Sequence, residues 1–557
     1  MPTYKTPNVY IEEKSTLGPS VVPVATAVPA FIGCTAIAGT GNQYRNQAIR
    51  ISSILDYTTL FGDPHPTPFT VTVDEDNEIS EITADNSPLD TPQYLMYYLL
   101  RLFFENGGGP CYVVSIGDYS GVPSKDAFLA GLAAVKKEDE PTLILLTDAV
   151  NLASADYYSL CQAVLSQCNT LKDRFGIFDV LADDYDFNGI GTGFREGIGT
   201  NDLKYGAAYY PYLQTVLNYH YTEASVSISG AAETTSDAPM GQYETSENGL
   251  LVTYSGPESD NPQVQINVAT SASRKNVAVA LDGGILTIDI PQKGASVATI
   301  LAAETNVDAY TLAAAGTGAD DITTSLDATP LEYAAAGGGS TLADLKTSQT
   351  GLYNTIKTAL SGMRVVLPPS GAVAGIYAKV DRERGVWKAP ANVSVASIIG
   401  PTVKINNEEQ ENLNVDATAG KSINAIRSFT GKGTLIWGSR TLAGNDNEWR
   451  YIPVRRLFNL IEESIQKATS FAVFESNTAI TWLKVKTIIS SYLDGLWRQG
   501  ALAGATPDQA YFVSVGLGQT MTTQDILEGR MLIEIGVAAV RPAEFIILQF
   551  SHKLQEA

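Results

Sequence analysis

A dense charge cluster in the sequence is formed by Asp381, Arg382, Glu383 and Arg384. It follows a Pro-Pro-Ser-Gly turn and an apolar run, and it precedes Gly385 and a Pro-Ala-Asn turn. Such a cluster could do acid–base chemistry, or its opposite charges could pair and hold two parts of the fold together. We interpret it as structural, at the junction between the layer that precedes it and the C-terminal domain.

Two short motifs resemble binding loops but lack a required residue. Asp184, Asp186 and Asn188 match the first half of a calcium loop, but the twelfth position, which needs a bidentate Glu, is Arg195. The stretch 416–422, "DATAGKS", has the Gly-Lys-Ser ending of a phosphate-binding loop, but Val415 stands where its first glycine belongs. We interpret the first as a polar turn and do not assign a nucleotide site to the second.

The remaining chemistry-bearing residues do not form a recognisable active site. The three histidines, His65, His220 and His552, lie far apart and have no Cys or His at zinc-ligand spacing. No Gly-x-Ser-x-Gly elbow supports a nucleophile. The sequence therefore predicts no catalytic residue, cofactor or metal, and a protein that is not an enzyme.

The composition limits the possible partners and the compartment. The formal charge of −23 argues against binding nucleic acid through its phosphates. The N-terminus lacks the apolar block of a secretory signal, and no apolar span is long enough to cross a membrane. The four cysteines include no CxxC pair, so we expect buried thiols in a protein assembled in the cytoplasm without membrane insertion.

Much of the negative charge lies in residues 219–340, which hold fifteen acidic residues against three basic ones. Short alternating runs such as "NPQVQINVAT" and "GILTIDIPQ" are separated there by Gly, Ser, Thr and Ala. Alternation with a period of two indicates strands with one wet face. We predict an inserted, mostly β domain that faces outward; the alternative is a flexible low-complexity linker.

Around the insertion, strands alternate with helices. Residues 92–104, 125–137 and 341–360 have helical patterns, and apolar runs such as "CYVVSIG" and "EPTLILLTD" indicate buried strands. This alternation predicts an α/β domain with a largely parallel sheet over residues 26–218, to which the chain returns at 341–400. We predict a strand and a turn for "MRVVLPPSGAVAGIYAKVD".

The C-terminal part, 401–557, has a different pattern. A helix opened by Pro453 and a second helix from about 479 to 497 are followed by "AYFVSVG", "RMLIEIGVAAV" and "AEFIILQFS". We predict an α+β domain with two helices on an antiparallel sheet of three strands.

Both chain ends contain strand-like runs. Residues 1–25 form an N-terminal arm and linker in which "NVYIEE" is separated from the core by a proline-rich stretch. A strand on such an arm can satisfy its backbone groups on the sheet edge of another subunit, although pairing within its own chain is the alternative. The expected subunit-interface residues are Val9, Tyr10, Ile11, Phe545, Ile546, Ile547, Leu548 and Phe550.

Several long blocks resemble, in order, those of contractile tail sheath proteins of phage tails, R-type tailocins and related injection systems. They include "FFENGGGPCYVV", "LPPSGAVAGIYAKVDRERGVWKAPAN", "WRYIPVRRLFNLIEESI" and "RPAEFIILQF". The resemblance covers about residues 1–218 and 340–557. Residues 219–340 match nothing that we can name, in keeping with the variable outer domains of this family.

The resemblance implies a structural subunit that polymerises in stacked rings around an inner tube and contracts to drive the tube through a target envelope. It implies further partners in baseplate and tail-terminator proteins, and a helix facing the tube, for which the candidates are Lys484 and Lys486, or Arg455 and Arg456. A surface-layer or capsid-like protein, and less so an α/β enzyme, are the alternatives.

Overall fold

The chain folds into two compact units, which are described separately. Unit 1 comprises Met1–Thr67, Asn86–Tyr221 and Ser361–Ala557, and unit 2 comprises Pro68–Asp85 and Thr222–Leu360. In the described residues no helix is long and apolar enough to cross a membrane. The computed structural model describes residues 21–74, 78–84, 94–121, 123–181, 192–229, 241–244, 249–256, 260–303, 306–314, 321–333, 341–416 and 418–547.

Unit 1 is built on a nine-stranded sheet with the order β2-β5-β1-β6-β7-β8-β25-β26-β23. The six strands from β5 to β25 are parallel, and β2, β26 and β23 are antiparallel to their neighbours. The bounds in sheet order are Ala48–Ile51, Cys111–Gly117, Pro29–Cys34, Leu143–Leu146, Phe175–Asp179, Gly206–Tyr210, Ile423–Phe429, Gly433–Ile436 and Val393–Ser394.

The central strands are apolar on both faces because the helices that connect parallel strands cover the sheet on both sides. On one face of β1, Phe31 packs against Phe103 of α2, with ring centroids 5.4 Å apart. On the other face, Ala30 and Ile32 share a core with α3 and α4. The mixed α/β architecture predicted from the sequence is confirmed. These helices are α2 (Met96–Glu105), α3 (Lys125–Val135) and α4 (Ser154–Leu171).

The prediction of a strand and a turn for "MRVVLPPSGAVAGIYAKVD" is correct only at its start, where β22 (Val366–Leu367) is a strand. The following residues form helix α9 (Ser370–Arg384), which packs against α2. A Cβ on Gly371 would lie 2.6 Å from the carbonyl oxygen of Leu99, and one on Gly375 would lie 2.4 Å from that of Phe103. Glycines one turn apart thus allow the two helix backbones to touch.

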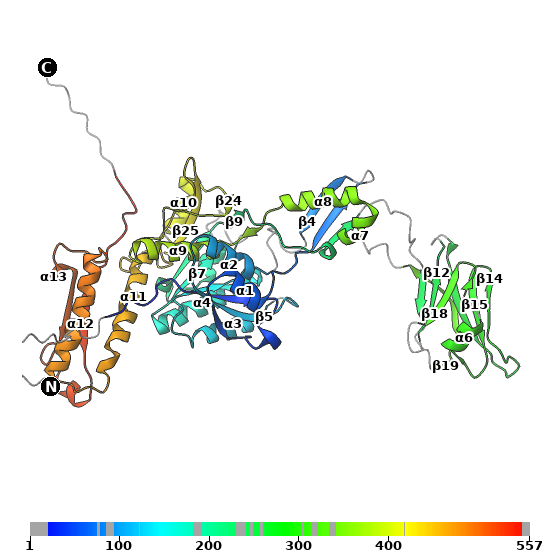
Figure 1. Cartoon of the computed structure of the whole chain (residues 1–557), viewed down its shortest axis with the longest axis horizontal. Helices are drawn as coiled ribbons and strands as arrows, with labels where there is room; N and C mark the ends of the chain where they lie inside the picture. The colour runs from blue at the N-terminus through cyan, green and yellow to red at the C-terminus, as the bar shows by residue number, and fades with distance from the viewer. Residues whose placement is uncertain are drawn as a thin grey trace, which may run out of the picture. The chain divides into compact units, whose positions relative to one another are not determined.

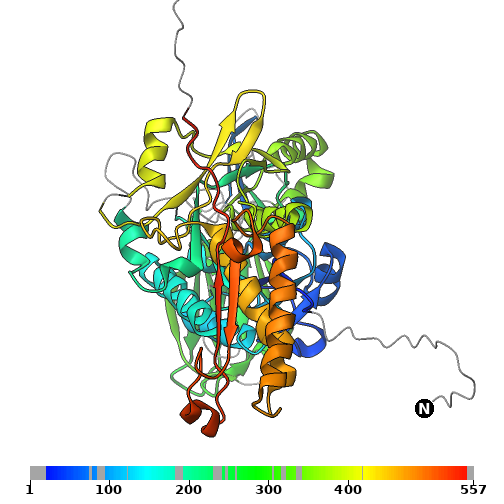
Figure 2. The ribbon, with the colours of Figure 1, turned by 90° about the vertical axis from the view of Figure 1, so that its left-hand side faces the viewer.

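The C-terminal part of unit 1 contains α11 (Ile452–Thr469), α12 (Ala479–Arg498) and an antiparallel pair, β27 (Tyr511–Val515) with β28 (Ile533–Val537). Figure 2 shows α12 alongside this pair, and both helices share an apolar core with it. The two predicted helices are confirmed, but the third strand is not formed: residues 541–547 are in no strand, and 548–551 lie outside the described residues.

Most of unit 2 is a two-sheet sandwich (Figure 1). One sheet has the order β17-β18-β12-β11-β21 and the other β14-β15-β13-β20. Alternate residues of β12 (Leu250–Tyr254) and β15 (Ile285–Ile290) enter a common core, together with α6 (Val297–Ala303). The alternation in the sequence therefore does correspond to strands. The other bounds are β11 Gly241–Glu244, β13 Gln263–Val268, β14 Ala278–Asp282, β17 Asn306–Val307, β18 Tyr310–Ala314, β20 Leu326–Pro330 and β21 Glu332–Tyr333.

Unit 2 is larger than the expected insertion 219–340. A three-stranded sheet, β10-β3-β4, joins β10 (Val226–Ser229) to β3 (Phe69–Val73) and β4 (Ile79–Ala84), which come from early in the chain. The unit also takes in α7 (Leu342–Ser348) and most of α8 (Thr350–Gly362), which we had expected in the returning α/β core and as one helix. Only contacts in three dimensions reveal these additions.

Candidate functional site

The charge cluster lies at the C-terminal end of α9, and Asp381 is its buried member. Its two carboxylate oxygens accept hydrogen bonds from Arg456 of α11, Nη1 to Oδ1 at 3.0 Å and Nη2 to Oδ2 at 2.5 Å. The side chains are only 5% and 3% exposed. Asp381 therefore pairs with the C-terminal domain and not with its own neighbours, as a bidentate ion pair that joins two parts of unit 1.

The same arginine holds the start of the described chain. Arg456 Nη2 donates to the carbonyl oxygen of Thr26 at 2.7 Å, and the guanidinium lies 4.6 Å from the ring centroid of Tyr377. Two residues earlier, the N–H of Val24 donates to Ser464 Oγ of α11 at 3.2 Å. Residues 21–26, at the end of the predicted N-terminal arm and linker, are thereby fixed to α11.

The other three members of the cluster are exposed. Arg382 Nη1 donates to the carbonyl oxygen of Gly107 at 3.1 Å. Arg382 and Arg384 lie in the last turn of α9, where positive charge is favourable to the helix dipole. Of the two acidic residues in the cluster, only Asp381 supports its interpretation as structural.

The four candidates for a tube-facing surface differ in exposure. Arg455 and Arg456 are 2% and 3% exposed, so the expectation of a surface role for them is corrected. Arg455 donates to Asn459 Oδ1 at 2.8 Å and to Glu462 Oε1 at 3.0 Å. Lys484 and Lys486 are exposed on α12. They remain the candidates.

The expected interface residues of the C-terminal run are exposed where the structure describes them. Phe545, Ile546 and Ile547 are 69%, 79% and 82% exposed. Val9, Tyr10, Ile11, Leu548 and Phe550 lie outside the described residues. Within the described chain, β27 and β28 have only each other as strand partners, so each keeps a free edge.

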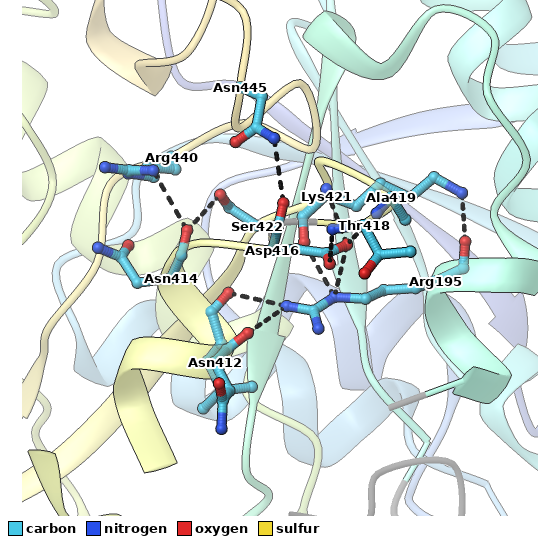
Figure 3. Close-up of polar contacts among 11 residues, drawn as sticks. Arg195, Asn412, Asn414, Asp416, Thr418, Ala419, Lys421, Ser422, Arg440 and Asn445 are labelled. Atoms are coloured by element: carbon cyan, nitrogen blue, oxygen red, sulfur yellow. Dashed lines mark hydrogen bonds and ion pairs between the residues drawn. The ribbon is translucent and has the colours of Figure 1, made fainter. Parts of the chain in front are cut away.

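The loop that resembles a phosphate-binding loop is filled by its own carboxylate (Figure 3). Asp416 accepts hydrogen bonds from the N–H groups of Thr418, Ala419 and Lys421 at 3.0, 3.1 and 3.3 Å. Arg195 lies 3.5 Å from the same carboxylate, and Lys421 Nζ donates to the carbonyl oxygen of Arg195. The N–H groups that would cradle a phosphate are thus already engaged.

The usual ligand position of a doubly wound sheet, at the carboxyl ends of its strands, is also occupied by the chain itself. Asp148, after β6, accepts from the N–H groups of Cys34 and Leu95 at 2.6 and 2.5 Å. Asp179, at the end of β7, accepts from the N–H of Ser370 at 2.8 Å. Burial raises the pKa of Asp148 to about 6 and that of Asp179 to about 7. Both carboxyls hold neighbouring segments in place.

Sequence models of two phage tail sheath domains match more than half of the chain. The "Phage tail sheath protein central domain" matches residues 253–442, and the "Phage tail sheath C-terminal domain" matches 444–553. The chain belongs to the phage tail sheath family. The central match begins inside the region that we had expected to match nothing, 219–340, so part of that region is shared with the family.

Relatives agree with this assignment. The tail sheath protein of Vibrio phage KVP40 is 26% identical over 33% of the chain, which spans about a quarter (26%) of that relative's length. The contracted sheath of the extracellular contractile injection system PVC is 27% identical with a TM-score of 0.55, over 100% of this chain and 99% of the other. The contracted helical sheath of the anti-feeding prophage is 28% identical with a TM-score of 0.56, over 99% and 100%.

Sequence reasoning found Asp381 but missed its ion pair with Arg456 and the hydrogen bond from Arg456 to Thr26. Arg456 is 75 residues away and Thr26 contributes only a carbonyl oxygen, so no local pattern marks either as part of this joint. The joint became visible only in the folded chain.

Proposed function

We propose that this sheath-family chain polymerises helically around an inner tube and contracts to drive the tube through a target envelope. The observation that carries the proposal is the match, over essentially the whole chain, to two sheaths captured in the contracted state. Assembly takes place in the cytoplasm, and the product is a phage tail or a phage-tail-like particle. Baseplate and tail-terminator proteins complete the particle, and one further match comes from an anti-feeding prophage baseplate.

Subunits are linked by strand exchange. The N-terminal run with Val9, Tyr10 and Ile11 and the C-terminal run from Phe545 pair with the free edges of β27 and β28 in neighbouring subunits. The exposure of residues 545–547 and the unpaired edges support this arrangement. Each main-chain hydrogen bond adds a net of roughly 1 kcal/mol, so an arm with four or five bonds couples neighbours by several kcal/mol.

Unit 2 faces away from the tube and α12 faces toward it. The sandwich of unit 2 has an apolar core of its own, which is the property expected of a variable outer domain. Lys484 and Lys486 supply exposed positive charge on a chain that is otherwise strongly acidic, so an acidic tube surface would be attracted to α12 in particular.

The experiment is negative-stain electron microscopy of the purified full chain and of a variant lacking residues 1–20. We expect hollow striated tubes from the full chain and only monomers from the truncation, because the N-terminal strand is lost. A variant lacking residues 552–557, which keeps both predicted strands, is the control and should form tubes. Discrete particles of one size from all three chains would contradict the proposal.

A further inference from the structure

Glu544 ties the C-terminal segment to the body of unit 1 through four hydrogen bonds. Arg440 donates from Nε to Oε1 at 2.9 Å and from Nη2 to Oε2 at 2.6 Å. Asn414 Nδ2 donates to Oε1 at 2.8 Å, and the Tyr451 hydroxyl donates to Oε2 at 3.2 Å. We call Glu544, Arg440, Asn414 and Tyr451 the Glu544 clamp.

Arg440, the main donor to Glu544, is held in place by contacts that do not involve Glu544. The side chain of Arg440 is 4% exposed, and its backbone N–H and carbonyl both bond to the side-chain amide of Asn424, each at 2.8 Å. Arg440 Nη1 also approaches the carbonyl oxygen of Asn414, the last residue of α10 (Asn407–Asn414), at 3.3 Å (Figure 3). The guanidinium is therefore held in one orientation, which lowers the entropy lost when a carboxylate binds.

The chain on both sides of Glu544 is loosely held. The last backbone hydrogen bond before it is from the N–H of Val540 to the carbonyl oxygen of Ala501, at 3.3 Å. Among residues 541–547, all of which are described, Glu544 is the one for which side-chain hydrogen bonds are found, and residues 545–547 are exposed. A single side chain thus separates the anchored chain from the free segment.

The protonation behaviour agrees with this geometry. Burial by itself would raise the pKa of Glu544, but the hydrogen bonds from Arg440 and Asn414 and the charge of Arg440 outweigh burial and hold the pKa below its usual range. The carboxylate is therefore ionised at neutral pH, where it forms charge-assisted bonds that are stronger than neutral ones.

We propose that Glu544 is a positioning residue that sets where the exchangeable C-terminal segment begins and passes the pull of a neighbouring subunit to the body of its own subunit. This inference rests on the proposed strand exchange. With the clamp closed, the segment offered to a neighbour begins at Phe545, the first of the exposed residues 545–547. With it open, the segment starts at Arg541 and leaves the body in no fixed direction, so its effective concentration at the neighbour's sheet edge falls.

The clamp is tested first in the monomer, by the rate of chymotrypsin cleavage after Phe545. A protease must take the neighbouring residues into its own cleft, so Glu544 has to leave Arg440 before the bond is cut. We expect cleavage about tenfold or more faster in Glu544→Gln, after correction with a peptide of residues 541–549 carrying each residue. Glu411→Gln, an exposed glutamate on α10, is the control and should cleave at the wild-type rate.

A second variant leaves the cleaved sequence unchanged. Asn414→Ala combined with Tyr451→Phe removes two donors to Glu544 and keeps Arg440, so the fold should survive and cleavage should again accelerate. Unchanged cleavage in this variant and in Glu544→Gln would overturn the clamp. The Asn414→Ala/Tyr451→Phe variant keeps the Arg440–Glu544 pair and should give the wild-type thermal unfolding curve, which separates release of the segment from general destabilisation. Glu544→Gln leaves the buried Arg440 without its carboxylate and should unfold at a somewhat lower temperature.

Assembly is the second readout. Full-length Glu544→Gln should form fewer and shorter tubes than wild type under the same conditions, while Glu411→Gln should match wild type. Faster cleavage with unchanged tubes would show that the clamp exists but does not position the segment, and would overturn the inference. If wild-type chains formed no tubes, the proposed function would fail, while the cleavage assay would still report on the clamp.

Discussion

At the scale of single residues, the function of a charge depends on whether it is buried with a partner. Asp381 and Arg384 stand three positions apart in one cluster, yet Asp381 is buried against Arg456 and Arg384 is exposed. Removing one partner of a buried ion pair leaves the other charged and desolvated, which costs far more than the net contribution of the pair. The two residues therefore form a natural comparison.

We expect Asp381→Ala to lower the free energy of unfolding of unit 1 by about 3–5 kcal/mol, because Arg456 is left without its carboxylate. Arg384→Ala should change it by less than about 0.5 kcal/mol. The measurement is urea unfolding followed by tryptophan fluorescence. All five tryptophans lie in unit 1, so the signal reports that unit alone. If the two substitutions lowered the free energy of unfolding equally, the Asp381–Arg456 pair would not be the joint described above.

The sequence could identify this cluster but not its contacts. The density of charge between an apolar run and a turn was visible, whereas the pairing depends on how α9 and α11 cross. Arg455 and Arg456 illustrate the opposite error. Two adjacent basic residues at the start of an amphipathic helix look like a solvated face, but both are buried. Arg455 packs on Trp449 and pairs with Glu462, which are near it in sequence, and Arg456 packs on Tyr377 and pairs with Asp381, which come from α9.

At the scale of elements, long amphipathic patterns and short buried apolar runs were predicted correctly, and one helix that is buried nearly all round was not. The helices α11 and α12 and the strands of the parallel sheet follow from spacing and apolar runs. Helix α9 was missed because a helix that is buried nearly all round has no polar face, and its glycines argue against a helix unless a second helix is known to cross there. The C-terminal run was predicted as a strand, but its described residues, 541–547, are paired with no strand.

Helix α12 carries the prediction that belongs to this scale. In the double variant Lys484→Glu and Lys486→Glu we expect an unchanged fold, because both side chains are exposed, and loss of extended sheath on inner tubes. The matched control is Lys136→Glu with Lys137→Glu, an exposed pair at the end of α3 with the same change in net charge. The measurement is electron microscopy of sheath assembled on purified tubes. Extended sheath formed equally by both variants would remove α12 as the tube-facing helix.

At the scale of the whole molecule, the sequence predicts only part of what makes up unit 2. The acidic composition of 219–340 showed that something is inserted, and the alternation showed that it contains strands. The contribution of β3 and β4 from residues 69–84 could not be seen, because their pairing with β10 joins segments about 150 residues apart and leaves no local signal.

The sandwich should nevertheless be removable. Ser227 of β10 pairs with Thr341, the cap of α7, so the chain leaves for the sandwich and returns from it at neighbouring points. Among the described residues, all buried members of the sandwich core lie between Leu250 and Leu331, so the sandwich has a core of its own. A short flexible loop can bridge such a gap, since the entropic cost of closure grows only slowly with loop length.

We therefore expect a chain in which residues 230–340 are replaced by a short Gly-Ser linker to keep the tryptophan-detected unfolding curve of the full chain and to form tubes with the same axial repeat. A matched control replaces residues 370–384 with the same linker; it deletes α9 and the Asp381 joint and should not fold. Aggregation of the first variant would mean that the sandwich supports the rest of the chain. Stable monomers that fail to form tubes would instead place subunit contacts in the sandwich, contrary to a proposal in which the terminal strands and the C-terminal domain join the subunits.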